Sequence, residues 1–218
     1  MEKCCICVYY GKGDNFMDDF RNPNDPRIKR TKRNLKNSFL ELMKEKPYHA
    51  ITVTDIVNKA EYNRTTFYRH YETKDELVQE LCDDIINDLI YAFRYPYRNA
   101  SFINPAELKP SDVIIFDYIM KHKNFYSLWK HGDGIPGFQN QIIHTMIQLY
   151  KSDIHYQAFG GKDDYLIIYQ AYGVWGLIIN WINNDFQPSA EEMANELIKI
   201  INYKPPKVYQ MKQPKRIR

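Results

Sequence analysis

The sequence predicts an all-α protein with an N-terminal three-helix helix-turn-helix domain and a larger C-terminal helical domain. The first observation is residues 52–74, which read as two short helices at a tight corner followed by the start of a third. The second is that apolar residues recur every four positions in the next segment, and the third is a set of apolar helical segments in the C-terminal half. We divide the chain into an arm, the helix-turn-helix domain, the larger helical domain and a basic tail: 1–26, 27–74, 75–203 and 204–218.

The composition fits a globular protein of a reducing compartment. A length of 218 residues allows one large or two small domains, and a hydrophobic content of 44% is enough for real cores. Three of the four cysteines crowd at Cys4, Cys5 and Cys7, which does not resemble a disulfide framework. No apolar run approaches the ~18 residues of a membrane span, and the N-terminus lacks a secretory signal. We therefore expect a cytoplasmic protein with no membrane partner.

A first helix is expected to begin at Arg27 and to be ended by Pro47. Its inner face carries apolar side chains at helical spacing: Ile28, Leu35, Phe39, Leu42 and Met43. Its outer face carries five bases: Lys29, Arg30, Lys32, Arg33 and Lys36. Such a basic run is usually only solubilising, but beside a DNA-reading helix it can contact phosphates and add salt-dependent affinity.

Residues 52–62 predict a short second helix and a corner. Thr52 can cap this helix, with Asp55 three residues on as the acid of a capping box. One apolar stripe follows at helical spacing and consists of Val53, Ile56, Val57 and Ala60. Glu61 and Tyr62 then form the corner.

Asn63 can cap a third helix that runs to about Tyr71. Phe67 and Tyr71 are four residues apart, so they share a side that should pack on the preceding helix. The other positions offer donors for base edges and phosphates: Arg64, Thr65, Thr66, Tyr68 and Arg69. The alternative is a solvated polar face on an ordinary helix.

These residues carry a family resemblance. The runs I-T-V-T-D-I-V-N-K-A, N-R-T-T-F-Y-R-H-Y and T-K-D-E-L resemble the DNA-binding head of the tetracycline-repressor (TetR/AcrR) family, over about residues 27–90. The resemblance implies phosphate contacts from Thr52, Tyr68, His70 and Lys74, and a base contact within reach of Thr54. Glu61 stands where the family usually has Gly, and a left-handed corner costs a non-Gly residue roughly 1 kcal/mol. We therefore expect the turn here to differ slightly.

The charge of the chain is divided along its length. Residues 27–74 carry 12 Lys and Arg against 5 Asp and Glu, a net +7, whereas the whole chain carries only +3. Residues 1–26 carry 3 bases and 5 acids, a net −2, and the tail at 204–218 adds 6 bases and no acid, which leaves residues 75–203 at −8. A basic head on an acidic body suits a protein that meets DNA with one end. The tail itself is expected to be extended or disordered and to add nonspecific DNA affinity.

Behind the head we expect only helices. A long helix capped by Thr73 should run toward Tyr91, with Cys82 as a packed small hydrophobe on its apolar stripe. After a proline-containing connector, Ser111 is expected to cap the next helix. Further helices are expected at 139–150, at 163–185 and, capped by Ser189 with Glu192, up to about residue 201.

The helix at 163–185 is expected to pack on both sides. Gly173 and Gly176 lie together on one side, and because glycine in a helix costs roughly 1 kcal/mol relative to alanine, a second backbone should pass close by. Four apolar residues form a face on roughly the opposite side: Ala171, Trp175, Ile178 and Ile182. The resemblance implies that the last two long helices pair with those of a second subunit in a four-helix bundle. We assign all six residues to a homodimer interface and leave open which face meets the partner.

The resemblance also implies a small-molecule effector in the helical domain, whose binding moves the two heads. Aromatic side chains such as Tyr169 and Tyr172 could line its pocket, although aromatics at helical spacing are usually core, and the ligand-binding residues stay unknown. The histidines and the Cys4–Cys7 cluster follow no metal-site spacing, so we expect no metal and no cofactor. No pattern of an enzyme active site stands out.

The function expected from these observations is a dimeric regulator of transcription that binds a two-fold double-stranded DNA operator, more often a repressor than an activator. An alternative is a TetR-like co-regulator that acts by pairing with another regulator and does not bind DNA alone. Glu61 at the corner is a faint hint in that direction.

Overall fold

The computed structural model describes residues 25–100, 103–130, 134–154 and 164–204, and within these ranges the chain forms helices and turns but no strand. The predicted all-α class is therefore confirmed. The α-helices are α1 Pro26–Glu45, α2 Val53–Lys59, α3 Arg64–Tyr68, α4 Lys74–Arg94, α5 Ile115–Lys121, α6 Lys123–Tyr126, α7 Phe138–Asp153, α8 Asp164–Asn183 and α9 Ala190–Ile201. Five 3₁₀ turns join them: η1 Tyr48–Ala50, η2 Tyr95–Tyr97, η3 Pro105–Glu107, η4 Pro110–Asp112 and η5 Ser127–Lys130. Residues 1–24 of the arm, which include its three cysteines, and residues 205–218 of the basic tail lie outside the described ranges.

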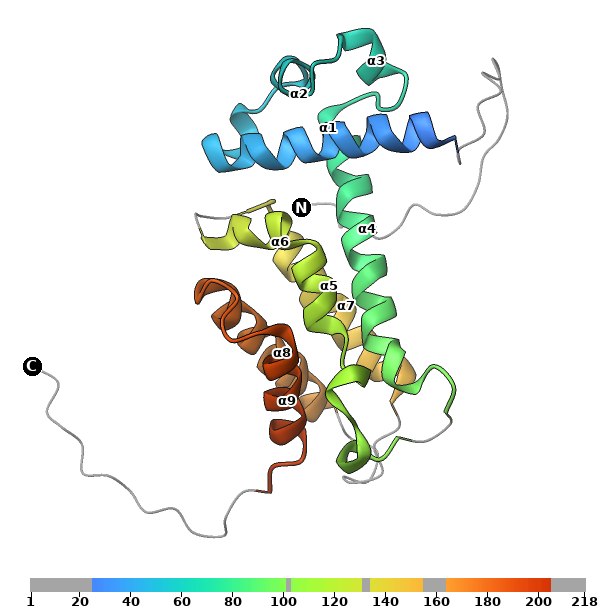
Figure 1. Ribbon diagram of the computed structural model, residues 1–218, viewed down its shortest axis with the longest axis vertical. Coiled ribbons are helices and arrows are strands. Elements are labelled where there is room, and N and C mark those ends of the chain that lie inside the picture. The colour runs from blue at the N-terminus through green and yellow to red at the C-terminus, as the bar shows by residue number, and fades with distance from the viewer. Residues whose placement is uncertain (1–24, 101–102, 131–133, 155–163, 205–218) are drawn as a thin grey trace, which may run out of the picture.

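Helices α1, α2 and α3 form a head at one end of the molecule, and α4 runs from beneath this head along the body (Figure 1). Asp25 caps α1 by accepting a 2.7 Å hydrogen bond from the Arg27 backbone N–H, and α1 ends just before Pro47, as expected. The inner face of α1 is buried at Leu35, Phe39 and Leu42.

Helix α4 buries its predicted stripe, because Leu77, Leu81, Ile85 and Leu89 are each at most 6% exposed. Cys82 on the same helix is buried and reduced, and burial raises the pKa of its thiol to about 12. A thiol that stays protonated behaves as a small hydrophobe, so the predicted packing role of Cys82 is confirmed.

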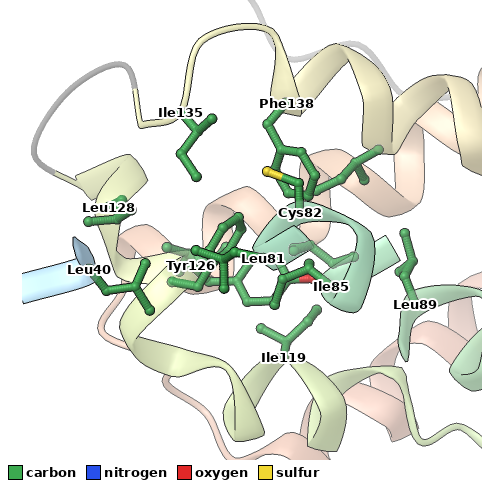
Figure 2. Packing of buried hydrophobic residues seen from close by; sticks show 14 of the residues in the cluster. Leu40, Leu81, Cys82, Ile85, Leu89, Ile119, Tyr126, Leu128, Ile135 and Phe138 are labelled. Atoms are coloured by element: carbon green, nitrogen blue, oxygen red, sulfur yellow. The ribbon is translucent and has the colours of Figure 1, made fainter. Parts of the chain in front are cut away.

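The head and the body share one apolar junction (Figure 2). Figure 2 shows Leu40 of α1 close to Leu128 and Tyr126 of the body, and Leu81 of α4 next to Tyr126 in the same buried cluster. Burying such side chains contributes about 1.5–3 kcal/mol each relative to exposure. The head is therefore packed on the body through side chains that both contribute, and α4 belongs to both cores.

The body is built from α5 to α9 around the lower part of α4 (Figure 1). Helix α8 packs against α7, α9 packs against α5, and α4 contacts both α5 and α7. Ser189 and Glu192 form the predicted capping box of α9. Ser111 lies inside turn η4 rather than at a helix N-cap, because Asp112 accepts the Lys109 backbone N–H and closes the turn there. Helix α5 accordingly begins later, at Ile115.

The two sides of α8 differ sharply in burial. Ala171, Trp175, Ile178 and Ile182 are at most 4% exposed because they pack inside the same subunit. We therefore correct their assignment to a subunit interface, since a partner could not reach them. Gly173 and Gly176 lie on the open side, where a Cβ atom would meet no heavy atom within 4 Å. No backbone of the described chain passes close to them.

Contrary to our expectation, α8 is long and apolar enough to cross a membrane by length and composition, with a mean hydropathy of 1.3. Core helices of soluble proteins pass the same test, and α8 buries one whole side against its own subunit.

Candidate nucleic-acid interface

Helix α2 begins with the predicted capping box. The Thr52 backbone N–H donates to Asp55 Oδ2 at 2.8 Å, and the Asp55 N–H donates to Thr52 Oγ1 at 3.2 Å. The Thr52 hydroxyl also donates to Asp55, at 2.7 Å. Lys46 contacts Asp55 as well, and the hydrogen bonds from Lys46 and Thr52 hold the pKa of this carboxyl well below its usual range. While the box is closed, neither donor of Thr52 is free for a phosphate.

The corner after α2 keeps a left-handed residue although that residue is not glycine. Glu61 has φ +57°, its N–H donates to the Asn58 carbonyl at 3.2 Å, and the Tyr62 N–H donates to the Val57 carbonyl at 2.9 Å. This pair of bonds is the Schellman pattern that ends a helix at a left-handed position. The expectation of a different turn is therefore wrong: the geometry is kept, and Glu61 carries the steric cost.

Helix α3 is capped as predicted but is shorter than predicted. The Thr66 N–H donates to Asn63 Oδ1 at 2.7 Å, and the Thr66 hydroxyl donates to the same oxygen at 2.9 Å. The helix ends at Tyr68 rather than near Tyr71; beyond it, the N–H groups of His70 and Tyr71 both donate to the Phe67 carbonyl, at 2.9 and 3.0 Å. Phe67 and Tyr71 are buried with ring centroids 5.7 Å apart, so they anchor α3 as expected.

The exposed side of α3 carries Arg64, Thr65, Tyr68 and Arg69. Tyr68 is 55% exposed although its ring packs edge-on against the buried Phe67. The Arg64 guanidinium donates to the Thr54 hydroxyl of α2, so the two helices present one surface. We call Thr54, Arg64, Thr65, Tyr68 and Arg69 the α3 surface. Thr66 and His70 are half-buried, and the Thr66 hydroxyl is occupied in the cap.

Lys74 has an internal contact that the sequence did not predict. Its Nζ donates to the backbone carbonyls of Tyr48 at 2.9 Å and Ile51 at 3.0 Å, and it lies 4.1 Å from the centre of the Tyr48 ring. These two hydrogen bonds use two of the three N–H donors of the ammonium. Lys74 therefore ties η1, which leads into α2, to the start of α4.

Two of the five predicted outer bases of α1 are turned inward instead. Lys32 and Lys36 contact Glu80 of α4 at 2.7 and 2.8 Å, and Lys36 also contacts Asp84 at 2.6 Å. Partial burial alone would raise the pKa of Glu80, but the two lysines outweigh it and hold the pKa below its usual range. Helical spacing could not separate these lysines from their neighbours, because their acids lie on another helix. Lys29, Arg30 and Arg33 stay exposed.

A short capped helix, anchored by two buried rings and presenting bases and hydroxyls beside a basic helix, is the arrangement of a helix-turn-helix domain. The chain belongs to the TetR family of transcriptional regulators. Residues 40–81 match the family described as bacterial regulatory proteins, tetR family, and residues 107–203 match a transcriptional regulator C-terminal region. The resemblance found in the sequence is thereby confirmed, and the family consists of regulators rather than enzymes.

Two curated relatives are similar in sequence. The HTH-type transcriptional regulator YxbF of Bacillus subtilis (strain 168) is 41% identical over 170 residues, which are 78% of this chain and 44% of YxbF. The HTH-type dhaKLM operon transcriptional activator DhaS of Lactococcus lactis subsp. lactis (strain IL1403) is 32% identical over 97 residues, 44% of this chain and 52% of DhaS. The chain thus matches about half the length of these relatives.

Solved structures share the fold. A TetR transcriptional regulator from Streptococcus agalactiae 2603V superimposes with a TM-score of 0.53 at 20% identity, covering 81% of this chain and 96% of that one. A TetR-family regulator from Syntrophomonas wolfei str. Goettingen gives a TM-score of 0.57 at 13% identity, covering 79% and 93%. At these identities the likeness concerns the fold alone.

Proposed function

We propose that the protein is a dimeric, sequence-specific DNA-binding regulator of transcription, which represses its target and is released by a small-molecule effector. The observation that carries this proposal is the α3 surface. Its side chains are donors or hydroxyls, they are held by the Asn63 cap and two buried rings, and they stand on the basic head. Fixed donors lose little conformational entropy when they meet a groove.

Within this surface, Arg64, Thr65 and Tyr68 are assigned to base edges, and Arg69 to a base edge or a phosphate. Thr54 is assigned to the same base edge as Arg64, because its hydroxyl accepts a hydrogen bond from the Arg64 guanidinium. His70 and the remaining N–H of Lys74 are assigned to phosphates. Thr52 and Thr66 leave the set of direct contacts, because their hydroxyls are donated within their own caps.

The test is an anisotropy titration of labelled DNA from the region flanking the protein's own gene, repeated at several salt concentrations. We expect saturable binding that weakens steeply with salt, because each neutralised phosphate releases counterions. A scrambled duplex of the same length should bind more weakly by roughly 1000-fold or more. Equal binding to both duplexes, or none to either, would refute the proposal.

Dimerisation is proposed to use the open side of α8. This side carries Gly173, Gly176 and a row of exposed apolar residues: Tyr165, Ile168, Tyr169 and Tyr172. Exposed apolar residues gathered on one helix commonly mark a protein contact. A second copy is the occupant that fits, since two heads related by a two-fold axis read two half-sites.

Gly176→Arg tests this interface sharply. The position is open, so the monomer should tolerate the side chain and gain helix propensity, whereas a close helix pair should be blocked. Light scattering should show a dimer for the wild type and for the control Gln139→Arg, which adds the same charge at an exposed position on α7. A dimer of unchanged affinity in Gly176→Arg would exclude this face.

The mode of regulation is proposed as repression, and a protein acting on bacterial DNA works in the cytoplasm. DhaS is named as an activator, so the sign needs its own measurement: transcription from the bound promoter should rise when the gene is deleted. The one observation that favoured the co-regulator alternative was the non-glycine residue Glu61 at the corner. It no longer favours that alternative, because the corner keeps the left-handed Schellman geometry.

A further inference from the structure

A crevice of about 170 Å³ lies at the junction of head and body. Its walls include Tyr48 of the head, Asp75, Val78 and Gln79 of α4, and Phe138 and Gln141 of α7. Cys82 and Ile135 also line it, and Figure 2 shows both beside Phe138. A ligand here would therefore touch the element that leads to α2, the long helix α4 and the body at once.

The crevice has the electrostatics of a site for a cation. Asp75 is the one acidic residue among the lining residues, which include no lysine, arginine or histidine. Asp75 accepts a hydrogen bond from the Tyr48 hydroxyl, but within the described chain no lysine or arginine pairs with it. The adjacent Lys74 directs its ammonium to two backbone carbonyls instead.

The rest of the lining suits a short apolar body attached to that charge. Val78 and Phe138 offer apolar surface, and the amide oxygens of Gln79 and Gln141 can accept further N–H donors. The volume is below the roughly 300–1,000 Å³ of sites for drug-sized molecules, so the ligand has only a few heavy atoms.

The crevice is also connected to the DNA-reading head. Tyr48 contributes its ring to the crevice, and the same residue supports Lys74 with its ring face and its carbonyl. The other carbonyl held by Lys74 belongs to Ile51, directly before the Thr52 cap of α2. Displacement of the Tyr48 ring would therefore disturb the support of α2, against which α3 packs.

We propose that this crevice binds a small organic monocation, such as a short alkylammonium, with its charged nitrogen on Asp75 and its chain on Val78 and Phe138, and that binding weakens the grip on DNA. The DNA half of this inference rests on the proposed function; the binding half does not. The ligand acts as a wedge between Tyr48 and the body, and the Lys74 contacts transmit its presence to α2.

The binding half is tested with n-butylammonium, 1-butanol and butyrate, which share a chain and differ in charge. Methyl NMR of the full-length protein follows Val78 and Ile135 during each titration. We expect saturable shifts with butylammonium and affinity weaker by about tenfold or more for 1-butanol, because the alcohol can still donate a hydrogen bond to Asp75 but has no positive charge to pair with the carboxylate. Butyrate should not bind. Equal affinity for the alcohol and the ammonium, or no shift at these methyls, overturns the proposal.

Asp75→Asn should weaken butylammonium binding by about tenfold or more while leaving 1-butanol unaffected. Asp117→Asn removes the same charge at an exposed position of α5 away from the crevice and should bind like the wild type. An equal loss in both variants would show general electrostatics and refute the site. If Asp75→Asn does not fold, the three probes on the wild type still decide.

The regulatory half is tested by measuring operator affinity with saturating butylammonium chloride and with sodium chloride at equal ionic strength. We expect affinity at least fivefold weaker with butylammonium. Equal affinities refute the coupling, even where NMR shows binding. If no DNA is bound in either salt, the proposed function fails, while the NMR titration still decides the crevice.

Discussion

Replacing Glu61 with glycine should stabilise the protein. Glu61 holds φ +57° at the corner after α2, and this left-handed conformation costs a residue with a Cβ about 1–2 kcal/mol. Glycine removes that cost but makes the unfolded chain more flexible, which costs about 0.4–1 kcal/mol. The midpoints of these two ranges predict a net gain of about 0.8 kcal/mol in the free energy of unfolding. The two Schellman hydrogen bonds use backbone atoms only, so Glu61→Gly keeps both.

The assay is urea unfolding followed by circular dichroism, with Glu61→Gln and Ala60→Gly as matched variants. Glu61→Gln removes the charge and keeps the Cβ, so its free energy of unfolding should change by less than about 0.5 kcal/mol. Ala60 has a right-handed conformation, so Ala60→Gly should lose about 0.5–1 kcal/mol. If Glu61→Gly is no more stable than Glu61→Gln, conformational strain at the corner is not the cause, and the reasoning fails.

Three further predictions concern the head. Arg64→Ala and Thr65→Ala should each change the preferred base pair by about 1–3 kcal/mol of discrimination, whereas Lys74→Ala should weaken binding to all sequences alike; selection from random duplexes separates these outcomes, and one common loss for all three would contradict the assignment. Phe67→Ala should lower the free energy of unfolding by about 3–5 kcal/mol, because the ring is fully buried. Thermal unfolding measures this loss, and a variant as stable as the wild type would show that Phe67 does not anchor α3. Glu80 has a lowered pKa in the folded protein, so its contribution is present above its unfolded pKa of about 4.5 and is lost as pH falls below it. Glu80→Gln should therefore lower the free energy of unfolding at pH 7 and make it depend less on pH in the acid range. If the acid pH dependence of the free energy of unfolding is the same in the variant and the wild type, Glu80 does not contribute in this way.

The local features of the head and of α9 could be predicted from the sequence because their causes lie within a few residues. A capping box joins residues three apart, so Thr52 with Asp55 and Ser189 with Glu192 needed no tertiary information. The same holds for the shared side of Phe67 and Tyr71, since helical periodicity places residues four apart together. With the family motifs, these local rules also indicated the α3 surface.

Other features depended on which element packs against which. Lys32 and Lys36 look like neighbouring outer bases on a helical wheel, and only the position of α4 turns them toward Glu80. Lys74 resembles a phosphate ligand in sequence, and only the fold brings the Tyr48 and Ile51 carbonyls to it.

Helix α8 shows the same division most clearly. Its sequence by itself determined a long helix with an apolar side and a glycine side, because that pattern is a property of spacing alone. Which side its own subunit covers was decided by the packing of neighbouring elements, among them α7 and η5: Ala171, Trp175, Ile178 and Ile182 are buried, and Gly173 and Gly176 are left open. Burial is a property of two surfaces in contact, and one helix supplies only one of them.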